Sequence, residues 1–179
     1  MILRTAALAL AGAVLAAPAA QAAPPIVDQT DPTGDVNIFD GGGTKPTTGQ
    51  RRSIDLEQFT VARHGDDVRF TFRIARIVAG RTFDQIVEAQ LVKAGRDGFE
   101  LDVLANPQHK NGTAYVGDTA CVVDVRTSRR TGTVRVDVPD RCIPEGAGLL
   151  RVSTYTQERN GSGPGFSEDT LRVRGHVTL

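Results

Sequence analysis

Four aspartates are spaced along the chain so that they could share one cation. Asp31 and Asp35 flank a glycine-containing turn, Asp55 opens the first long β-rich segment, and Asp169 precedes the last one. Carboxylate oxygens carried on separate, flexible loops are the ligands that Ca²⁺ prefers. Aspartate is also common in turns because its side chain bonds its own backbone, and that alternative requires no ion. The sequence leaves both interpretations open, and calcium is the one cofactor that it suggests.

The chain has two cysteines, Cys121 and Cys142. In an exported protein, an even pair of cysteines usually joins under oxidising conditions. Closing a loop of this size is expected to stabilise the domain by about 3 kcal/mol. A catalytic or redox pair would require close C-x-x-C spacing with a base nearby, and the sequence has neither. We therefore predict a structural disulfide between these two residues.

Other residue types that catalyse reactions are scattered along the chain. There is no G-x-S-x-G nucleophile motif and no H-E-x-x-H zinc motif. We expect all three histidines on the surface, with His64 at a hairpin tip, His109 in a loop and His176 on the exposed face of the last strand. Two carboxylates can hydrolyse a glycosidic bond, but acids of unknown separation specify no reaction. We predict no catalytic residue, and an extracellular glycosidase-type hydrolase is the alternative.

The first 22 residues have the features of a secretory signal peptide. Arg4 precedes an apolar run from Ala6 to Ala17, and the small residues Ala20 and Ala22 fit a cleavage site. The run of about a dozen residues is shorter than the roughly 20 that a membrane-spanning helix needs. We expect cleavage before Ala23 and release of a secreted, extracellular protein that is not attached to a membrane.

Composition limits the classes of partner. Cleavage would remove 22 of the 179 residues, including Arg4 and no acidic side chain, which leaves 20 basic and 21 acidic residues. A chain of this length forms one domain with a single core. Its near-zero charge and few aromatics argue against nucleic-acid binding. One hairpin does concentrate arginines, either as a solvated tip or as a surface for an acidic partner: Arg126, Arg129, Arg130 and Arg135.

Alternation of apolar and polar residues predicts antiparallel hairpins from residue 54 onward. The first joins Ile54–Val61 to Val68–Ile74 through a glycine turn. In the first strand of this hairpin, the alternation of apolar and polar residues shifts by one position between Glu57 and Gln58, which indicates a β-bulge. Two further hairpins pair 86–92 with 99–104 and 121–125 with 134–138, and two more strands are expected at 149–155 and 171–179. No segment shows a sustained helical period.

Short strands joined by hairpins, without β-α-β alternation, predict an all-β fold. We expect an antiparallel two-sheet β-sandwich of jelly-roll or immunoglobulin-like type, closed by one disulfide. The chain divides into a signal peptide (1–22), a Gly/Pro/Thr-rich segment whose short strands pack on the sandwich (23–53), and the sandwich core (54–179).

Four short motifs resemble those of small secreted proteins of actinobacteria. They are Asp31–Val36, Ile54–Leu56, His64–Asp67 and Val138–Cys142. The β-sandwich of those proteins is similar to that of DOMON domains and family 9 carbohydrate-binding modules. The resemblance implies a sandwich fold and, by analogy, a glycan ligand. It does not imply haem binding, because the single methionine, Met1, belongs to the signal peptide.

Taken together, these features predict a secreted, non-catalytic binding or accessory module. The expected partner is a cell-wall or extracellular polysaccharide, or another cell-envelope component, and neither nucleic acid nor a membrane. A structural protein of the cell envelope is a further alternative, beside the hydrolase. Tyr115 and Tyr155 are the tyrosines available for stacking on a sugar, whereas Phe70 and Phe72 fall on core-facing positions.

Overall fold

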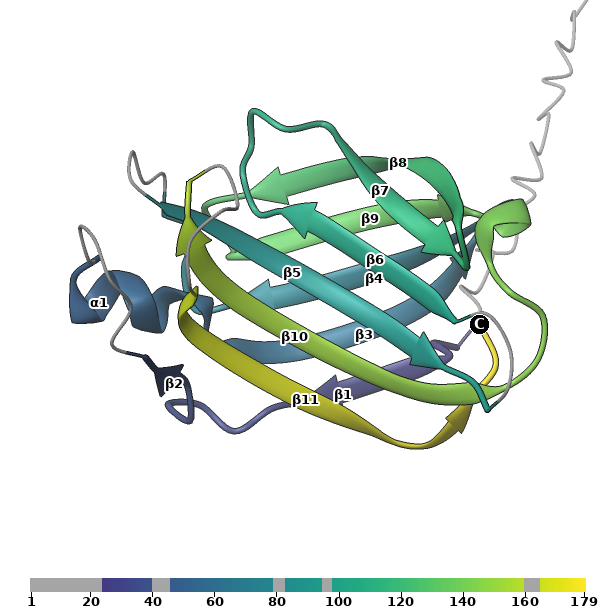
Figure 1. Ribbon diagram of the computed structural model, residues 1–179, viewed down its shortest axis with the longest axis horizontal. Coiled ribbons are helices and arrows are strands. Elements are labelled where there is room, and N and C mark those ends of the chain that lie inside the picture. Colours follow the sequence, from purple (N-terminus) through teal and green to yellow (C-terminus); the bar gives the residue numbers. More distant parts are fainter. Residues whose placement is uncertain (1–23, 40–45, 79–82, 95–97, 160–164) are drawn as a thin grey trace, which may run out of the picture.

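The computed structural model describes residues 24–39, 46–78, 83–94, 98–159 and 165–179. The predicted signal peptide lies outside these residues. Most of the described chain is β-strand, and its helices are single turns (Figure 1). No helix among the described residues is long and apolar enough to cross a bilayer. The predicted all-β, antiparallel class is confirmed.

The described residues contain eleven strands and three short helices. The strands are β1 (Val27–Thr30), β2 (Asn37–Ile38), β3 (Leu56–His64), β4 (Asp67–Ile74), β5 (Phe83–Val92), β6 (Phe99–Leu104), β7 (Asn111–Val116), β8 (Thr119–Ser128), β9 (Thr133–Pro139), β10 (Gly148–Glu158) and β11 (Gly165–Val177). The helices are α1 (Thr48–Arg51) and two 3₁₀ turns, η1 (Arg52–Ile54) and η2 (Asp140–Cys142).

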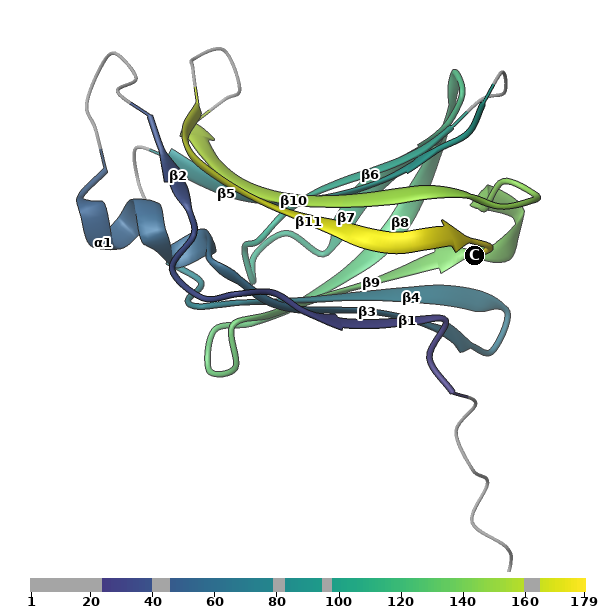
Figure 2. The same ribbon diagram turned by 90° about the horizontal axis from the view of Figure 1, so that it is seen from below.

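The strands form one continuous antiparallel sheet in the order β1-β3-β4-β9-β8-β7-β6-β5-β10-β11-β2. This sheet curls into a half-barrel. β1, β3, β4 and β9 make a lower layer, β5, β10 and β11 make an upper layer, and β6, β7 and β8 connect the two (Figure 2). The predicted division into two separate sheets is therefore corrected to one sheet folded over itself. Apolar alternation shows which face of a strand is buried, but not whether neighbouring hairpins are hydrogen-bonded to each other.

The core lies between the two layers and is built from the alternating apolar residues. Phe59, Phe70 and Phe72 are fully buried, as predicted for the last two. The ring centroids of Phe59 and Phe72 lie 5.1 Å apart. Phe70 stacks on Phe99 of β6 at 5.5 Å, which joins the lower layer to the connecting strands. Burying one such side chain contributes about 1.5–3 kcal/mol.

The three predicted hairpins are present as β3–β4, β5–β6 and β8–β9. The register of β3–β4 shifts between Leu56 and Gln58, so the predicted bulge is confirmed. The bulge allows Leu56 and Phe59 to face the core from the same strand despite their odd spacing.

Two elements were missed by the sequence analysis. β7 includes Gly112 and Thr113 where a strand signal would need alternating apolar residues. α1 falls in the Gly/Pro/Thr-rich segment 23–53, where only short strands were expected, and Thr47 and Gln50 form a reciprocal capping box that starts one helical turn. Both elements are short and weakly apolar, so periodicity carries little information about them.

The amino-terminal segment spans the gap between the two ends of the sheet. β1 pairs with β3 and β2 pairs with β11, so residues 27–38, which we call the strap, run from the lower layer to the upper one (Figure 2). The side-chain amide of Gln29 in the strap donates to the carbonyl oxygen of Arg172 in β11 at 3.2 Å. The connection between β1 and β2 carries two of the four aspartates expected to bind calcium.

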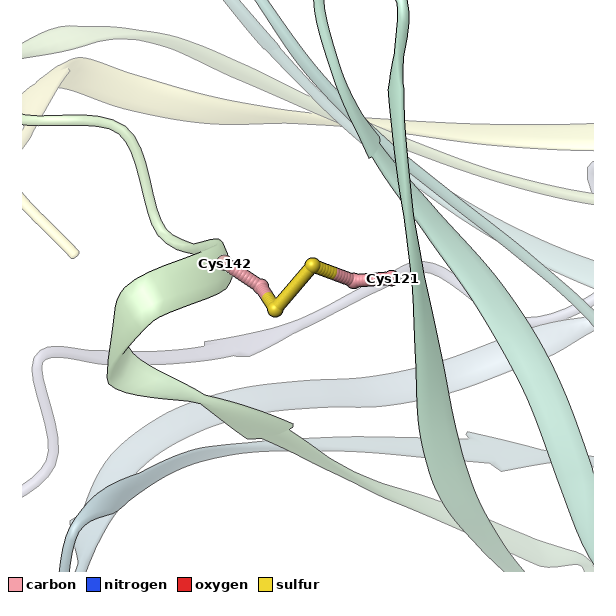
Figure 3. Close-up of a disulfide and its surroundings, with 2 residues drawn as sticks. All are labelled: Cys121 and Cys142. Carbon is pink, nitrogen blue, oxygen red and sulfur yellow. A yellow bond between two sulfur atoms is a disulfide. The ribbon is translucent and has the colours of Figure 1, made fainter.

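The predicted disulfide between Cys121 and Cys142 is confirmed (Figure 3). Cys121 lies near the start of β8 and Cys142 ends the η2 turn after β9, with their Cα atoms 6.2 Å apart. Cys142 is buried in the core. The bond fixes the turn that leads from β9 toward β10, and it is consistent with an oxidising compartment.

Candidate metal centre

Three of the four predicted aspartates converge at the strap. One carboxylate oxygen from each of Asp31, Asp35 and Asp169 lies within 4.8 Å of the others. Asp31 and Asp35 come from the connection between β1 and β2, whereas Asp169 comes from β11. Asp55 is not part of this group of three but lies next to it, because its Oδ2 accepts a hydrogen bond from Gly34 N at 2.8 Å. The structure therefore places all four residues in one region of the fold.

Asp169 is positioned by the sheet itself. It lies within β11, opposite Thr154 of β10, on the face that carries the core residue Leu171. Its side chain is buried, and its Oδ2 accepts a hydrogen bond from Leu56 N at 2.7 Å. That bond joins the start of β3 to β11 across the open side of the half-barrel.

Asp55 is held at the junction between η1 and β3. Its backbone N–H donates to Arg52 O at 3.3 Å, and its carbonyl oxygen accepts from Ala75 N at 2.8 Å. Its Oδ2 is bound by Gly34, whose φ of +90° gives the strap the tight turn that this contact needs. The other oxygen, Oδ1, is buried without a hydrogen-bond partner among the described residues.

The two strap aspartates differ in exposure. The backbone N–H of Asp31 donates to Glu57 O at 3.2 Å, which fixes the strap against β3. The Oδ2 atom of Asp31 is also buried with no partner among the described residues. Asp35 is exposed to solvent. The group therefore has a closed side, formed by Asp31, Asp55 and Asp169, and an open side at Asp35.

The electrostatics of the cluster oppose its full ionisation. Burial, followed by the charges of Asp169, Asp35 and Asp55, raises the pKa of Asp31 from 3.8 to about 7. Burial is also the largest cause of the raised pKa values of Asp55 and Asp169, although the N–H groups of Gly34 and Leu56 act in the opposite direction. Without a cation, this group of carboxylates can lower its repulsion only by binding protons.

The composition of the cluster fits a hard cation. All ligand atoms are carboxylate oxygens, and two of those in the region, Asp31 Oδ2 and Asp55 Oδ1, are buried without a hydrogen-bond donor in the part of the chain that the structure describes. Oxygen ligands select Ca²⁺, Mg²⁺ or Mn²⁺, whereas Zn²⁺ and Cu⁺ favour nitrogen and sulfur. Three separated chain segments and an exposed edge suit the irregular six- to eight-fold coordination of Ca²⁺ better than the strict octahedron of Mg²⁺.

The three histidines, which could act as bases, all lie on the surface. His109 and His176 are exposed, as expected. His64 lies at the end of β3, and its Nδ1 is 3.2 Å from Arg69 Nη2. The same guanidinium forms an ion pair with the buried Asp137 at 2.6 Å, which lowers the pKa of that carboxyl group. This arrangement ties β3, β4 and β9 together on the outer face of the lower layer.

The arginine-rich hairpin is the β8–β9 hairpin, and its arginines are exposed. Arg126 and Arg135 lie directly opposite each other in the register, and Arg129 and Arg130 occupy the turn. Like charges in opposite positions repel each other, so the side chains are expected to spread into solvent. Arg129 lines a hollow of only about 20 Å³, together with residues that include Asn106 and Pro107.

A second group of acids, which the sequence did not point to, lies on the polar face of β5 and β6. Glu88 of β5 and Asp102 of β6 are direct cross-strand partners, and burial is the largest cause of the raised pKa of each. Both residues fall on polar positions of their strands, but the predicted ranges 86–92 and 99–104 would pair residue 92 with 99, whereas the structure pairs Leu91 with Phe99 and so brings Glu88 opposite Asp102.

Comparison with models of known protein families, with curated proteins and with solved structures found no match to this chain. The resemblance to DOMON domains and family 9 carbohydrate-binding modules therefore stays an expectation from the sequence.

Proposed function

We propose that this protein is an exported, non-catalytic module that binds Ca²⁺ through Asp31, Asp35, Asp55 and Asp169. In this role the ion fastens the strap across the open side of the half-barrel. The observation that carries the proposal is the meeting of Asp31, Asp35 and Asp169, beside which Asp55 is bound to the strap. Asp31 and Asp55 each present a buried carboxylate oxygen that has no hydrogen-bond donor among the described residues.

Turn chemistry does not account for the cluster. An aspartate that only stabilises a turn bonds to its own neighbouring backbone. Asp169 lies inside a long strand, and its carboxylate binds Leu56, which is 113 residues away. Asp55 binds Gly34, which is 21 residues away. These carboxylates join distant segments, as the ligands of a structural ion do.

Charge repulsion supplies the driving force for binding. Two carboxylates 4.8 Å apart repel each other by about 1 kcal/mol in a water-like dielectric and by about 3.5 kcal/mol at an effective dielectric of 20. A divalent cation converts these repulsions into attractions and provides the partner that the buried oxygens lack. Folding of the strap and binding of the ion are then coupled.

The proposed export rests on the amino-terminal sequence and on the disulfide, which is typical of oxidising compartments. The proposal of a non-catalytic role rests on the separation of the three histidines and on the absence of a nucleophile motif from the sequence. A hydrolase that uses Glu88 and Asp102 is the second candidate, because both acids have raised pKa values and Glu88 lines a hollow of the surface.

Calorimetric titration of the chelator-treated, signal-free protein with CaCl₂ tests the proposal. We expect saturable binding with a Kd of about 10⁻⁴–10⁻³ M, the range of extracellular modules, and weaker binding of MgCl₂. The Asp169→Asn variant should lose the binding, whereas Asp118→Asn, at the exposed turn between β7 and β8, should retain it. The calcium role is ruled out if CaCl₂ at ten times the weakest expected Kd produces neither a heat of binding nor a higher unfolding temperature.

A further inference from the structure

The arginine-rich hairpin presents a compact group of exposed cations. Its turn projects beyond the lower layer, on the side away from the core (Figure 2). Including the exposed Asp124, residues 124–136 carry four positive charges and one negative charge, a net charge of +3. None of the four arginines forms a salt bridge with an acid in the part of the chain that the structure describes. They are Arg126, Arg129, Arg130 and Arg135.

Other arginines of the lower layer are neutralised by partners. Arg69 binds Asp137 at 2.6 Å, and Arg73 binds Glu57 at 3.0 Å. The pKa of Asp137 is lowered first by its hydrogen bonds from Arg69, whereas the charge of Arg126 makes a smaller contribution. The charge of the arginine-rich hairpin is therefore largely uncompensated within the fold.

The turn that carries these arginines is held in place. Ile74 N, at the end of β4, donates to Gly132 O at 2.9 Å. Gly132 has a φ of +63°, and a Cβ atom at this position would lie 2.0 Å from Ile74 O, so the contact requires glycine. Thr131 Oγ1 donates to Ser128 Oγ across the turn at 2.9 Å. A turn that is already ordered in the free protein loses less entropy when it binds a ligand.

The cross-strand pair of arginines makes an anionic ligand favourable. Arg126 and Arg135 are direct partners in the register, and like charges in this position destabilise a sheet. Arg151 and Arg172 form a similar pair in the upper layer, but Glu168 lines the same hollow and offsets part of their charge. The arginine-rich hairpin lacks such an acid between its arginines, so an external anion supplies the missing charge.

We infer that the arginine-rich hairpin binds a linear phosphate polymer. The planar fork of an arginine side chain matches a pair of phosphate oxygens. The small hollow beside Arg129 cannot enclose a ligand, so the partner lies across an open surface. From Arg126 to Arg129 the chain covers up to about 10 Å. A polymer with a negative charge on every unit reaches several of these arginines at once, whereas an extended acidic peptide turns alternate side chains away.

The composition of the hairpin distinguishes this partner from a membrane and from nucleic acid. The turn residues Ser128, Thr131 and Gly132 have no large apolar side chain, and binding at a membrane interface depends on apolar burial. Residues 125–136 contain no aromatic ring on which a nucleotide base could stack. None of the four aspartates of the metal centre lies in this hairpin. The inference is therefore independent of calcium.

Fluorescence anisotropy of labelled linear polyphosphate, titrated in EDTA with the signal-free, disulfide-bonded protein, tests the inference. We expect saturable binding that weakens as NaCl rises from about 50 to about 200 mM, with a logarithmic slope of about 2–3 for three or four phosphate contacts. The double variant Arg129→Gln, Arg130→Gln should bind about tenfold more weakly and lower the slope by about 1.4. We expect a similar loss in Arg126→Gln, Arg135→Gln.

The matched control is Arg151→Gln, Arg172→Gln, which removes the same charge from the cross-strand pair of the upper layer. It should change the Kd by less than about twofold, because salt screens charges that lie outside the contact. The turn variant alters only exposed side chains, so it remains informative if the strand variant does not fold.

Weaker binding in either hairpin variant, with an unchanged circular dichroism spectrum and an unaffected control, supports the inference. Absence of wild-type binding at 50 mM NaCl overturns it, as does binding that both hairpin variants retain or an equal loss in the control variant. Tighter binding of phosphatidylglycerol vesicles or of polyglutamate than of polyphosphate would overturn the assignment of a phosphate chain.

Discussion

Replacing Asp31 by Asn should have opposite effects with and without calcium. In chelator at pH 8, Asp31 is ionised in a region where burial and three neighbouring carboxylates raise its pKa to about 7. The amide has similar size and carries no charge, so it should relieve the repulsion. In calcium, the same change removes a charged ligand and should weaken binding.

The expected magnitude follows from the pKa. A shift from 3.8 to about 7 corresponds to about 4 kcal/mol of destabilisation above pH 7. Because Asp31 is partly exposed, solvent screening reduces this to about 1–2 kcal/mol. The variant should therefore unfold about 2–8 °C higher than the wild type in chelator. With calcium at about 100 times its Kd, the wild type gains about 2.7 kcal/mol, which the variant largely loses, so the order reverses.

The dependence of folding stability on pH provides a second check. The folded chain retains a proton on Asp31 that the unfolded chain releases near pH 4, so folding in chelator is favoured at low pH. The stability of the wild type should fall as pH rises from about 4 to about 7 and level off above, and that of Asp31→Asn should fall less.

Urea unfolding followed by circular dichroism, in chelator and in CaCl₂, measures these differences. Asp118→Asn is the control and should change stability by less than about 0.5 kcal/mol in both buffers. Equal destabilisation of Asp31→Asn in the two buffers would refute the reasoning, because it would mean that the carboxylate serves the turn and not a cation.

Three further predictions concern the ion, the disulfide and the core. Calcium affinity, measured by calorimetry, should be about tenfold weaker at pH 6 than at pH 8, because the ion binds the ionised form of Asp31; an affinity independent of pH would contradict this. The double variant Cys121→Ser, Cys142→Ser should lose about 3 kcal/mol in urea unfolding under oxidising conditions, while its calcium affinity stays unchanged because the bond lies outside the aspartate cluster. Phe70→Ala should cost about 3–5 kcal/mol because it opens a cavity between the layers, whereas Val122→Ala, at a side chain that is 73% exposed, should cost less than about 0.5 kcal/mol; similar losses would argue against the assigned core.

The sequence by itself determined the local structure. Alternation around Phe70 and Phe72 defined a strand and its buried face, and a parity shift near Glu57 located the bulge in the partner strand. The cysteine count predicted the disulfide. These features depend on neighbours along the chain or on a single pair of residues, and such information is present in composition and period.

The tertiary structure decided how the hairpins join and which distant residues meet. One sheet curls over itself because β9 pairs with β4 and β10 pairs with β5, and no local pattern specifies those pairings. The meeting of Asp31 with Asp169 depends on the strap crossing from one end of the sheet to the other. The pairing of Glu88 with Asp102 depends on the register of one hairpin, and the hollow that Glu88 lines lies over β5, β10 and β11, which only the tertiary structure brings together. Contacts between residues far apart in the sequence are set by the packing of the two layers, so they become visible only when the sheet has closed around its core.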